Sequence, residues 1–446
     1  MLYSAAMLNT EQLRAWVVSA DMGLGHQRAT SPLAGIAEEG VITAGDASVC
    51  SPKEKKLWEK TRRAYEFLSR VRAVPIIGKP LFGALDELQK IAPFYPLRDL
   101  SHTTYQVHLM DRLIRKGIGG ELIAKMRSRP LPMVTSFMLP AIAADAAGYE
   151  PVYCIICDAD ISRAWVAKNP KTSRIRYFVP CGNVIRRLKS YGVPDEHIFL
   201  TGFPMPLEVL GSRDLDVLRA DTAQRLIYLD PNNRFWPLHG LNVAHFLGRE
   251  NCCPKQERAL TITYAVGGAG AQRETGRQIA ESLRTKIEKG EVILNLVAGI
   301  RKDVSDYFEQ VKAALLPKHP GLRILYAPQK EDYFRRFAQT IRATDILWTK
   351  PSELSFYCGL GLPIIMSPPI GAQERFNARW LTEIQAGIPQ DDPHYADQWL
   401  FDLLNAGRLA EAAWSGFLKA RKYGTYRIID FLRTGTLPHD PSPLKR

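Results

Sequence analysis

The chain contains two successive series of short apolar segments that alternate with stretches of helical character. In the first half these segments lie at 15–20, 132–137, 151–159, 176–180 and 198–204. In the second half they lie at 260–266, 291–299, 322–328, 345–350 and 363–368. Alternation of this kind is typical of parallel sheets whose strands are joined by crossover helices. The sequence therefore predicts an α/β protein with two Rossmann-like domains that face each other across a cleft.

The two series set the expected domain bounds. Residues 1–205 form the first domain, which carries a helical, basic insertion at 51–130. Residues 206–255 are rich in turn-forming and polar residues, so we expect a connector there. Residues 256–446 form the second domain with its terminal helices.

Composition and charge limit the class of protein. The net charge of +13 favours anionic partners, but the sequence shows no RNP-type strand, zinc finger or helix-turn-helix signal, so we expect no nucleic-acid binding. Seven cysteines without a disulfide-like spacing favour a reduced, cytoplasmic setting. Cys154 and Cys157 lie inside an apolar run, which favours a buried strand over a metal or redox pair. The N-terminus does not resemble a signal peptide, and no apolar run is long enough to span a bilayer.

A first glycine-bearing loop, "SADMGLGHQRA" (19–29), follows the first apolar segment, and a helix is expected from about Gln27. Gly23 and Gly25 could begin a dinucleotide-binding motif, but its third small position is occupied by Arg28. On a loop facing a cleft, His26 could instead accept a proton from an acceptor hydroxyl, because an imidazole titrates near neutral pH. The remaining alternative is a histidine that only caps or packs at a helix start.

A second loop, "VGGAGAQ" (266–272), opens a helix after the strand-like segment 260–266. Small residues at a helix N-terminus let backbone N–H groups approach an anion. Gly268, Ala269, Gly270 and Gln272 are therefore candidates to contact a diphosphate, and Arg273 could add positive charge. A tight turn without a ligand is the alternative.

A third region, 349–380, gathers polar side chains around two further strand ends. Carboxylates and amides there could hold ribose or sugar hydroxyls through paired hydrogen bonds. The alternative, which the sequence supports equally, is that these side chains only cap helices or lie on solvated helix faces. The residues concerned are Asp345, Lys350, Glu353, Gln373, Glu374 and Asn377.

Several of these segments, in this order, resemble the GT-B nucleotide-sugar glycosyltransferases. The resemblance is carried by "TKP" (349–351), "GLP" (361–363), "GAQERFN" (371–377), "GLGH" (23–26), "VPCGNVIRRLKSYGVPDEHIFLTGFP" (179–204) and "VGGAGAQ". Within that family, the motifs resemble those of monogalactosyldiacylglycerol synthase, bacterial diacylglycerol glucosyltransferase and the cell-wall enzyme that adds N-acetylglucosamine to a lipid-linked muramyl precursor. The resemblance covers most of the chain except 51–130 and 206–255.

The resemblance implies an inverting transferase with an acceptor domain followed by a nucleotide-sugar domain. It assigns the catalytic base to His26, diphosphate contact to Gly268, Ala269 and Gly270, and donor-sugar contact to Gln373 and Glu374. Asp158 or Asp160 lies where relatives have an acidic residue after a strand, and it could orient or polarise His26 or act as the base itself, with helix capping as the alternative. One departure concerns the ribose-binding Glu of the family, whose position is Phe356 here. Glu353 would replace it from a shifted position, which leaves the identity of the donor nucleotide open.

A basic, aromatic-bearing stretch at 53–90 is the last feature. Such a helix can lie on an anionic membrane surface, and in the lipid glycosyltransferases the acceptor domain meets a membrane here. An ordinary helix with a solvated basic face is the alternative. We therefore expect a cytoplasmic protein, with peripheral binding to the inner face of the membrane as an option.

The sequence as a whole favours transfer of a sugar from a nucleoside diphosphate, uridine diphosphate being the first candidate, to a hydroxyl acceptor such as a lipid. No metal is expected, because the second half lacks an Asp-x-Asp pair and Asp158-x-Asp160 lies in the first. The nucleotide-sugar is a co-substrate, and no further cofactor is expected. The alternatives are a sugar-nucleotide epimerase of the same architecture, a non-catalytic nucleotide-sugar-binding protein and, less favoured, a dinucleotide oxidoreductase.

Overall fold

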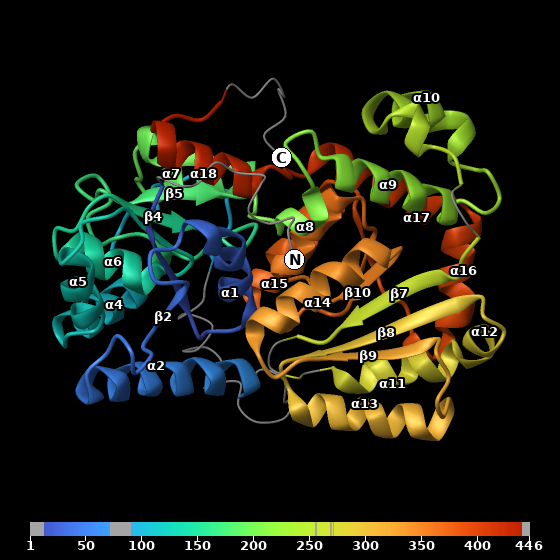
Figure 1. Cartoon of the computed structure of the whole chain (residues 1–446). Helices are drawn as coiled ribbons and strands as arrows, with labels where there is room; N and C mark the ends of the chain where they lie inside the picture. The colour runs from blue at the N-terminus through green and yellow to red at the C-terminus, as the bar shows by residue number, and fades with distance from the viewer. Residues whose placement is uncertain (1–12, 72–90, 255–256, 268–269, 271, 439–446) are drawn as a thin grey trace. The chain divides into compact units, whose positions relative to one another are not determined.

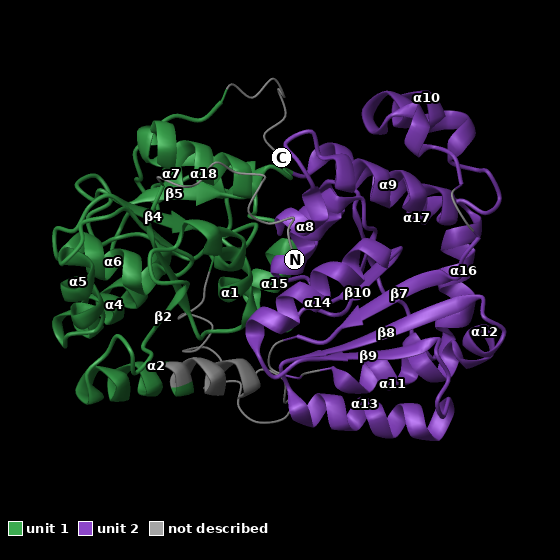
Figure 2. Cartoon of the chain, viewed as in Figure 1, with its two compact units in different colours: residues 1–205, 370–377, 421–446 green, residues 206–369, 378–420 purple. Residues whose placement is uncertain are grey.

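The structure is a computed structural model that describes residues 13–71, 91–254, 257–267, 270 and 272–438. The chain divides into two compact units (Figure 2). Unit 1 consists of Met1–Met205, Ile370–Asn377 and Arg421–Arg446, and unit 2 of Pro206–Pro369 and Ala378–Ala420. Each unit is built around one six-stranded parallel sheet, which confirms the predicted α/β class with two Rossmann-like sheets.

The sheet of unit 1 has the strand order β2-β1-β3-β4-β5-β6 (Figure 1). Parallel pairing sets Val17 opposite Val134 and Cys154 opposite Tyr177. Its strands are short and mostly buried, as expected for a parallel sheet covered on both faces. They are β1 (Trp16–Ala20), β2 (Ile42–Ala44), β3 (Met133–Thr135), β4 (Val152–Ile155), β5 (Arg176–Val179) and β6 (Ile198–Leu200).

Helices and 3-10 turns of unit 1 connect these strands. They are α1 (Leu24–Thr30), η1 (Ser31–Ile36), α2 (Pro52–Val71), α4 (Tyr105–Arg115), α5 (Gly120–Arg127), α6 (Met138–Ala146), η2 (Arg163–Trp165), α7 (Gly182–Ser190) and η3 (Asp195–His197). The insertion at 51–130 is thus helical over most of its described length, as expected.

The last helix of the chain, α18 (Gly424–Thr434), belongs to unit 1. The ring of Phe431 lies 4.2 Å from that of Phe199 and 5.4 Å from that of Phe178, measured between ring centroids. Thr425 Oγ1 donates to the carbonyl of Met205 at 2.5 Å. These contacts explain why 421–446 groups with unit 1, whereas the sequence placed it with the second domain.

The sheet of unit 2 has the order β12-β11-β10-β7-β8-β9. Its strands are β7 (Leu260–Ala265), β8 (Val292–Gly299), β9 (Leu322–Tyr326), β10 (Ile346–Thr349), β11 (Ile364–Met366) and β12 (Gly387–Pro389). Its helices include α11 (Arg273–Ser282), α12 (Arg284–Glu288), α13 (Lys302–Leu315), α14 (Lys330–Ala343), η5 (Glu353–Leu360), η6 (Pro393–Tyr395), α16 (Ala396–Asn405) and α17 (Arg408–Lys419). In Figure 1, α13 packs along β8 and β9, and α14 along β7 and β9. The helix α15 (Ala372–Glu383) begins in unit 1 and continues in unit 2.

Residues 206–255, expected as a connector, are largely helical and belong to unit 2. They form α8 (Leu207–Leu210), α9 (Asp216–Tyr228), α10 (Trp236–Leu247) and η4 (Arg249–Asn251). The turn between α9 and α10 is closed by Asp230, whose carboxylate accepts the backbone N–H groups of 234, 235 and 236 at 2.7, 2.9 and 3.0 Å. Turn-forming residues therefore separate two helices here and do not mark an unstructured link.

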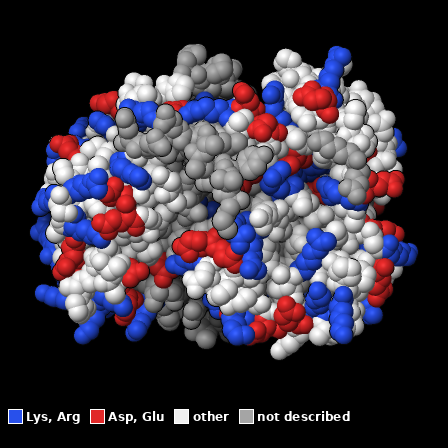
Figure 3. Space-filling view, viewed as in Figure 1, with Lys and Arg blue, Asp and Glu red and all other residues white. Residues whose placement is uncertain are grey.

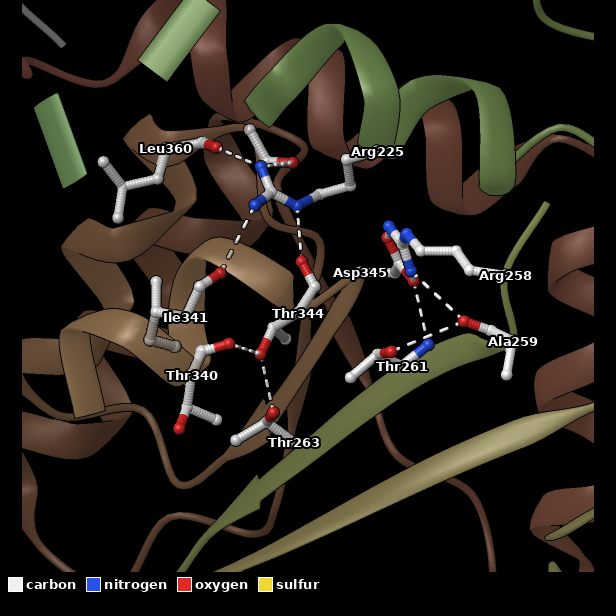
Figure 4. Close-up of polar contacts among 11 residues, drawn as sticks. Arg225, Arg258, Ala259, Thr261, Thr263, Thr340, Ile341, Thr344, Asp345 and Leu360 are labelled. Carbon is white, nitrogen blue, oxygen red and sulfur yellow. Dashed lines mark hydrogen bonds and ion pairs between the residues drawn. The ribbon is translucent and has the colours of Figure 1, made fainter. Parts of the chain in front are cut away.

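A buried arginine ties α9 to the elements around β10 (Figure 4). Arg225 donates to the carbonyls of Thr344 at 2.7 Å, Leu360 at 2.6 Å and Ile341 at 3.4 Å. Burial lowers the pKa of this guanidinium to about 10, with nearby carboxylates opposing the shift. The side chain therefore joins α9 to the ends of α14 and η5 through hydrogen bonds to buried carbonyls.

Candidate functional site

In both units the candidate residues lie mainly at the carboxyl edge of the sheet, where open α/β sheets bind ligands. Asp345 does not, because it immediately precedes β10 and therefore lies at the amino edge. Its carboxylate accepts two bonds of 2.6 Å from Arg258 and one of 2.8 Å from the N–H of Thr261 (Figure 4). The ligand-binding role considered for Asp345 is therefore replaced by a structural one.

His26 lies inside a helix and not on an extended loop. Gly23 has a φ of +105°, a value that favours glycine, and α1 starts at the next residue, so Gly25 and His26 form its first turn. The helix start expected near Gln27 was three residues too late. The sharp turn at Gly23 places the imidazole close to the end of β1.

The orientation of the imidazole is set by Ser136, directly after β3. Nδ1 of His26 lies 2.7 Å from the carbonyl oxygen of Ser136. A carbonyl can only accept, so Nδ1 carries the proton and the basic lone pair belongs to Nε2. Ser136 Oγ donates back to the carbonyl of His26 at 2.7 Å, and the rings of Phe137 and Trp165 lie 5.0 and 6.0 Å from the imidazole.

The loop after β4 contains both acidic candidates, and the structure gives them different surroundings. Asp160 is 1% exposed and forms a bidentate ion pair with Arg187, with both N···O distances 2.7 Å. Burial opposes the charge of Arg187, but the hydrogen bonds and charge of Asp160 outweigh it, and the pKa of Arg187 lies above its ordinary value. Asp160 is therefore placed as a structural anchor, whereas Asp158 is only half-buried.

Asp158 is bonded to a residue 219 positions away in the chain. Asn377 Nδ2 donates to Asp158 Oδ1 at 2.9 Å, and the N–H of Ala159 donates to Asn377 Oδ1 at 2.7 Å. Asn377 is fully buried and belongs to unit 1. The residue that the sequence grouped with the donor side thus contacts the loop assigned to the acceptor side.

The neighbours of Asn377 at the start of α15 differ from one another. Glu374 Oε2 accepts the N–H groups of Ile370 at 2.6 Å and Gly371 at 3.2 Å, so it caps the start of its own helix. Gln373 is half-buried and precedes Asn377 by four residues, which places the two on the same helix face. Glu374 therefore has at least the helix-capping role that the sequence offered as the alternative to ligand binding.

In unit 2, the side chain of a lysine packs against the second glycine loop. Lys350 directly follows β10, and a Cβ added at Gly267 would lie 2.8 Å from Lys350 Cδ and closer still to Cε. Gly270 has a φ of +72°, and its N–H closes a turn onto the carbonyl of Gly267 at 2.8 Å. Gly268 and Ala269 lie outside the described residues. Because glycine has no Cβ, residue 267 leaves room for the side chain of Lys350.

Two arginines lie beside the same loop. Arg273 is the first residue of α11, as the sequence indicated, and lies 3.9 Å from the carboxylate of Asp303. Arg301 was missed, although it follows β8, the neighbour of β7. A Cβ on Gly270 would lie 3.0 Å from Arg301 Nε. Arg301 also pairs with Asp303 at 3.0 Å, which lowers the pKa of that carboxyl.

The remaining donor-side candidates lie at the ends of β10 and β11. Gln272, with a φ of +70°, donates through Nε2 to the carbonyl of Pro368 at 3.0 Å. Glu353 is half-buried and begins η5. Phe356 is 2% exposed, and its ring lies 5.0 Å from that of Trp380, so the position of the family's ribose-binding Glu is a core aromatic here.

The basic stretch begins with α2, whose described basic side chains are largely exposed. Its Trp58 is buried and donates to Glu54 Oε1 at 3.1 Å. Glu54 also accepts the N–H of Gly119 at 2.7 Å and of Glu121 at 3.2 Å, which caps the start of α5. Residues 72–90 lie outside the described part. On the face drawn in Figure 3, Lys and Arg side chains lie among Asp and Glu side chains.

Membrane-spanning and metal-binding features are absent from the described residues. Among them, no helix is long and apolar enough to cross a membrane. No group of three or more His, Cys, Asp or Glu side chains in the same part of the chain could hold a metal ion. Cys154 and Cys157 are buried, as predicted from their apolar surroundings.

Comparison with known proteins found neither a protein-family model nor a curated protein that matches the chain. Solved structures similar to it include Acinetobacter baumannii MurG, at 15% identity over 94% of this chain and 99% of that chain, with a TM-score of 0.49. Another is the UDP-GlcNAc 2-epimerase of Neisseria meningitidis, at 10% identity over 94% and 100%, with a TM-score of 0.47. A third is the glycotransferase of kitacinnamycin, at 14% identity over 96% and 100%, with a TM-score of 0.46.

Proposed function

We propose that the chain is an inverting glycosyltransferase that moves a sugar from a nucleoside diphosphate to a hydroxyl acceptor. The observation that carries this proposal is the hydrogen bond from His26 Nδ1 to the carbonyl of Ser136. It leaves the basic lone pair of the imidazole on Nε2, the form that a general base needs. The motif resemblance, which assigns the base to the same histidine, supports it independently.

The donor diphosphate would be held in unit 2. The N-terminus of α11, the turn at Gly270 and the cationic groups of Lys350, Arg273 and Arg301 would offset the charge of a diphosphate. Gly268 and Ala269 would add backbone N–H groups, as the resemblance implies. Glu353, Gln373 and Glu374 are proposed to contact the ribose and sugar hydroxyls, and uridine diphosphate is the carrier we propose first.

The proposed reaction is a single displacement. Nε2 of His26 takes the proton of the acceptor hydroxyl while its oxygen forms a bond to the anomeric carbon. The bond between that carbon and the diphosphate oxygen breaks, and the leaving diphosphate keeps the electron pair. Cationic side chains and helix N–H groups stabilise the charge that develops on it. Attack opposite the leaving group inverts the anomeric configuration.

A lipid is the acceptor class we propose first, which would place the protein at the inner face of the membrane. The exposed lysines of α2 support contact with an anionic surface, but buried Trp58 is unavailable for it. An epimerase is the second candidate function, because it would use the same diphosphate-binding groups. It predicts turnover of the sugar nucleotide without any acceptor.

The test is a panel of nucleoside diphosphates, nucleotide-sugars and NAD measured by thermal stabilisation, followed by turnover with and without a lipid acceptor. A ligand that binds only the folded state raises its stability as the ligand concentration rises above the dissociation constant. We expect one nucleoside diphosphate family to stabilise the protein and turnover to require an acceptor. Isomerisation of the sugar nucleotide alone would favour the epimerase, and stabilisation by NAD alone would contradict both proposals.

A further inference from the structure

We propose that Asn377 is a positioning residue that fixes the loop after β4 and so sets the direction of the Asp158 carboxylate. The resemblance places Asn377 beside residues that contact the donor sugar, whereas its side-chain amide contacts the protein's own backbone and carboxylate. The catalytic part of this inference rests on the proposed function. The structural part does not.

The amide of Asn377 is oriented by its two partners. The N–H of Ala159 requires an acceptor, so the atom 2.7 Å from it is the amide oxygen. The carboxylate of Asp158 requires a donor, so the atom 2.9 Å from it is the amide nitrogen. Because Asn377 is fully buried, loss of the side chain would remove one hydrogen bond from each of these two groups in unit 1. Aspartate there would set one carboxylate against another.

The same loop is held at two further points. Cys157 Sγ lies 3.8 Å from the carbonyl oxygen of Ser136, which also accepts the hydrogen bond from His26 Nδ1. Asp160 is clamped by Arg187. Contacts at 157, 158–159 and 160 leave the loop little freedom, so the direction of Asp158 is set by the protein before any substrate arrives.

This arrangement joins two candidate groups in one compact unit. Asp158 follows the residue that shares the Ser136 carbonyl with His26, and Asn377 ties it to the first turns of α15. A carboxylate held in this way suits an acceptor hydroxyl, because ionised carboxylates accept hydrogen bonds from hydroxyls. Asn377 would therefore act on the reaction through Asp158.

The sharpest test exchanges the two groups. Asn377→Asp should lower the folding equilibrium constant at least about fivefold, because two carboxylates then face each other. Adding Asp158→Asn should restore most of the loss, since the amide introduced by the second substitution can donate to the carboxylate introduced by the first, and the N–H of Ala159 keeps an acceptor. Urea unfolding measures both, with Arg379→Ala, an exposed substitution on the same helix, as the control. Equal stability of Asn377→Asp and the parent would overturn the link.

Turnover separates the catalytic part. With a nucleotide-sugar and a lipid acceptor, Asn377→Ala should lower kcat at least about tenfold with donor KM nearly unchanged, whereas adding Asn377→Ala to Asp158→Ala should cause little further loss. A raised donor KM with unchanged kcat would instead make Asn377 a donor ligand and overturn the proposal. If Asn377→Ala does not fold, the double variant Asn377→Asp, Asp158→Asn is measured in its place. We expect this variant to be folded but to have lost turnover, because it lacks the carboxylate at position 158. If no donor supports turnover in the parent, the proposed function fails while the unfolding test still stands.

Discussion

Arg187 and Asp160 form a bidentate ion pair in which both side chains are at most 2% exposed. A buried pair of this kind is costly to break from one side, because the remaining charge is left without a partner. Asp160 lies two residues beyond Asp158, so its ion pair with Arg187 makes the end of that loop part of the core of unit 1.

Arg187→Met should therefore destabilise the protein by about 3–5 kcal/mol. The double variant Arg187→Met, Asp160→Asn should lose less, because no buried charge then remains. Chemical unfolding measures both, and Arg186→Met on the same helix is the more exposed neighbour for comparison. A double variant less stable than Arg187→Met alone would show that Asp160 has a further partner of equal weight.

His26→Ala should reduce turnover by about 10²–10⁴-fold, the range for loss of a general base. The affinity for the nucleoside diphosphate should change little, because the proposed diphosphate contacts come from other residues. Steady-state kinetics and thermal stabilisation separate the two effects, with the exposed His245→Ala as control. Unchanged turnover would remove His26 from the catalytic role.

Gly267→Ala should weaken binding of a nucleoside diphosphate about tenfold, which corresponds to about 1.4 kcal/mol. The new Cβ would occupy the space of Lys350 Cδ and Cε and force that side chain to move. Gly35→Ala is the matched control, since a Cβ there meets no atom within 4 Å. Equal affinity of both variants would indicate that Lys350 does not contact the ligand.

Cys50 should react with a thiol reagent far more slowly than the exposed Cys253. Burial, and then the charge of Glu54, raise the pKa of Cys50 to about 12, so at about pH 8 only about one molecule in 10⁴ holds its thiolate. Between about pH 9 and 12 the unfolded chain loses this proton while the folded protein keeps it, so the contribution of Cys50 to stability falls as pH rises. Mass spectrometry of alkylated peptides checks the order, and early labelling at Cys50 would contradict it.

The repeated apolar segments were sufficient to predict ten of the strands, because each is a short apolar run that alternates with a stretch of helical character. β2 and β12 were not predicted. The sequence of β2 is Ile-Thr-Ala and that of β12 is Gly-Ile-Pro, so each has only one large apolar residue and neither shows the apolar signal of its neighbours. Their positions depend on pairing with β1 and β11.

Local motifs identified most candidate residues but not their partners. The bond between Asp158 and Asn377 spans 219 residues, and no spacing in the sequence indicates it. Arg301 could have been found, because it follows a strand predicted to pair beside the glycine loop. Which of Asp158 and Asp160 is the better catalytic candidate could not be decided locally, because the difference between them is the ion pair of Asp160 with the distant Arg187.

The carboxylate of Glu54 accepts the N–H groups at the start of α5, and Trp58 fills the space above Gly45, where a Cβ would lie 2.7 Å from its ring. Deleting the first turns of α2 would therefore uncap a helix more than sixty residues away and open a void in unit 1. The start of the 51–130 insertion is for this reason an integral part of unit 1. A variant with a shortened insertion would have to keep the residues up to Trp58 to remain folded.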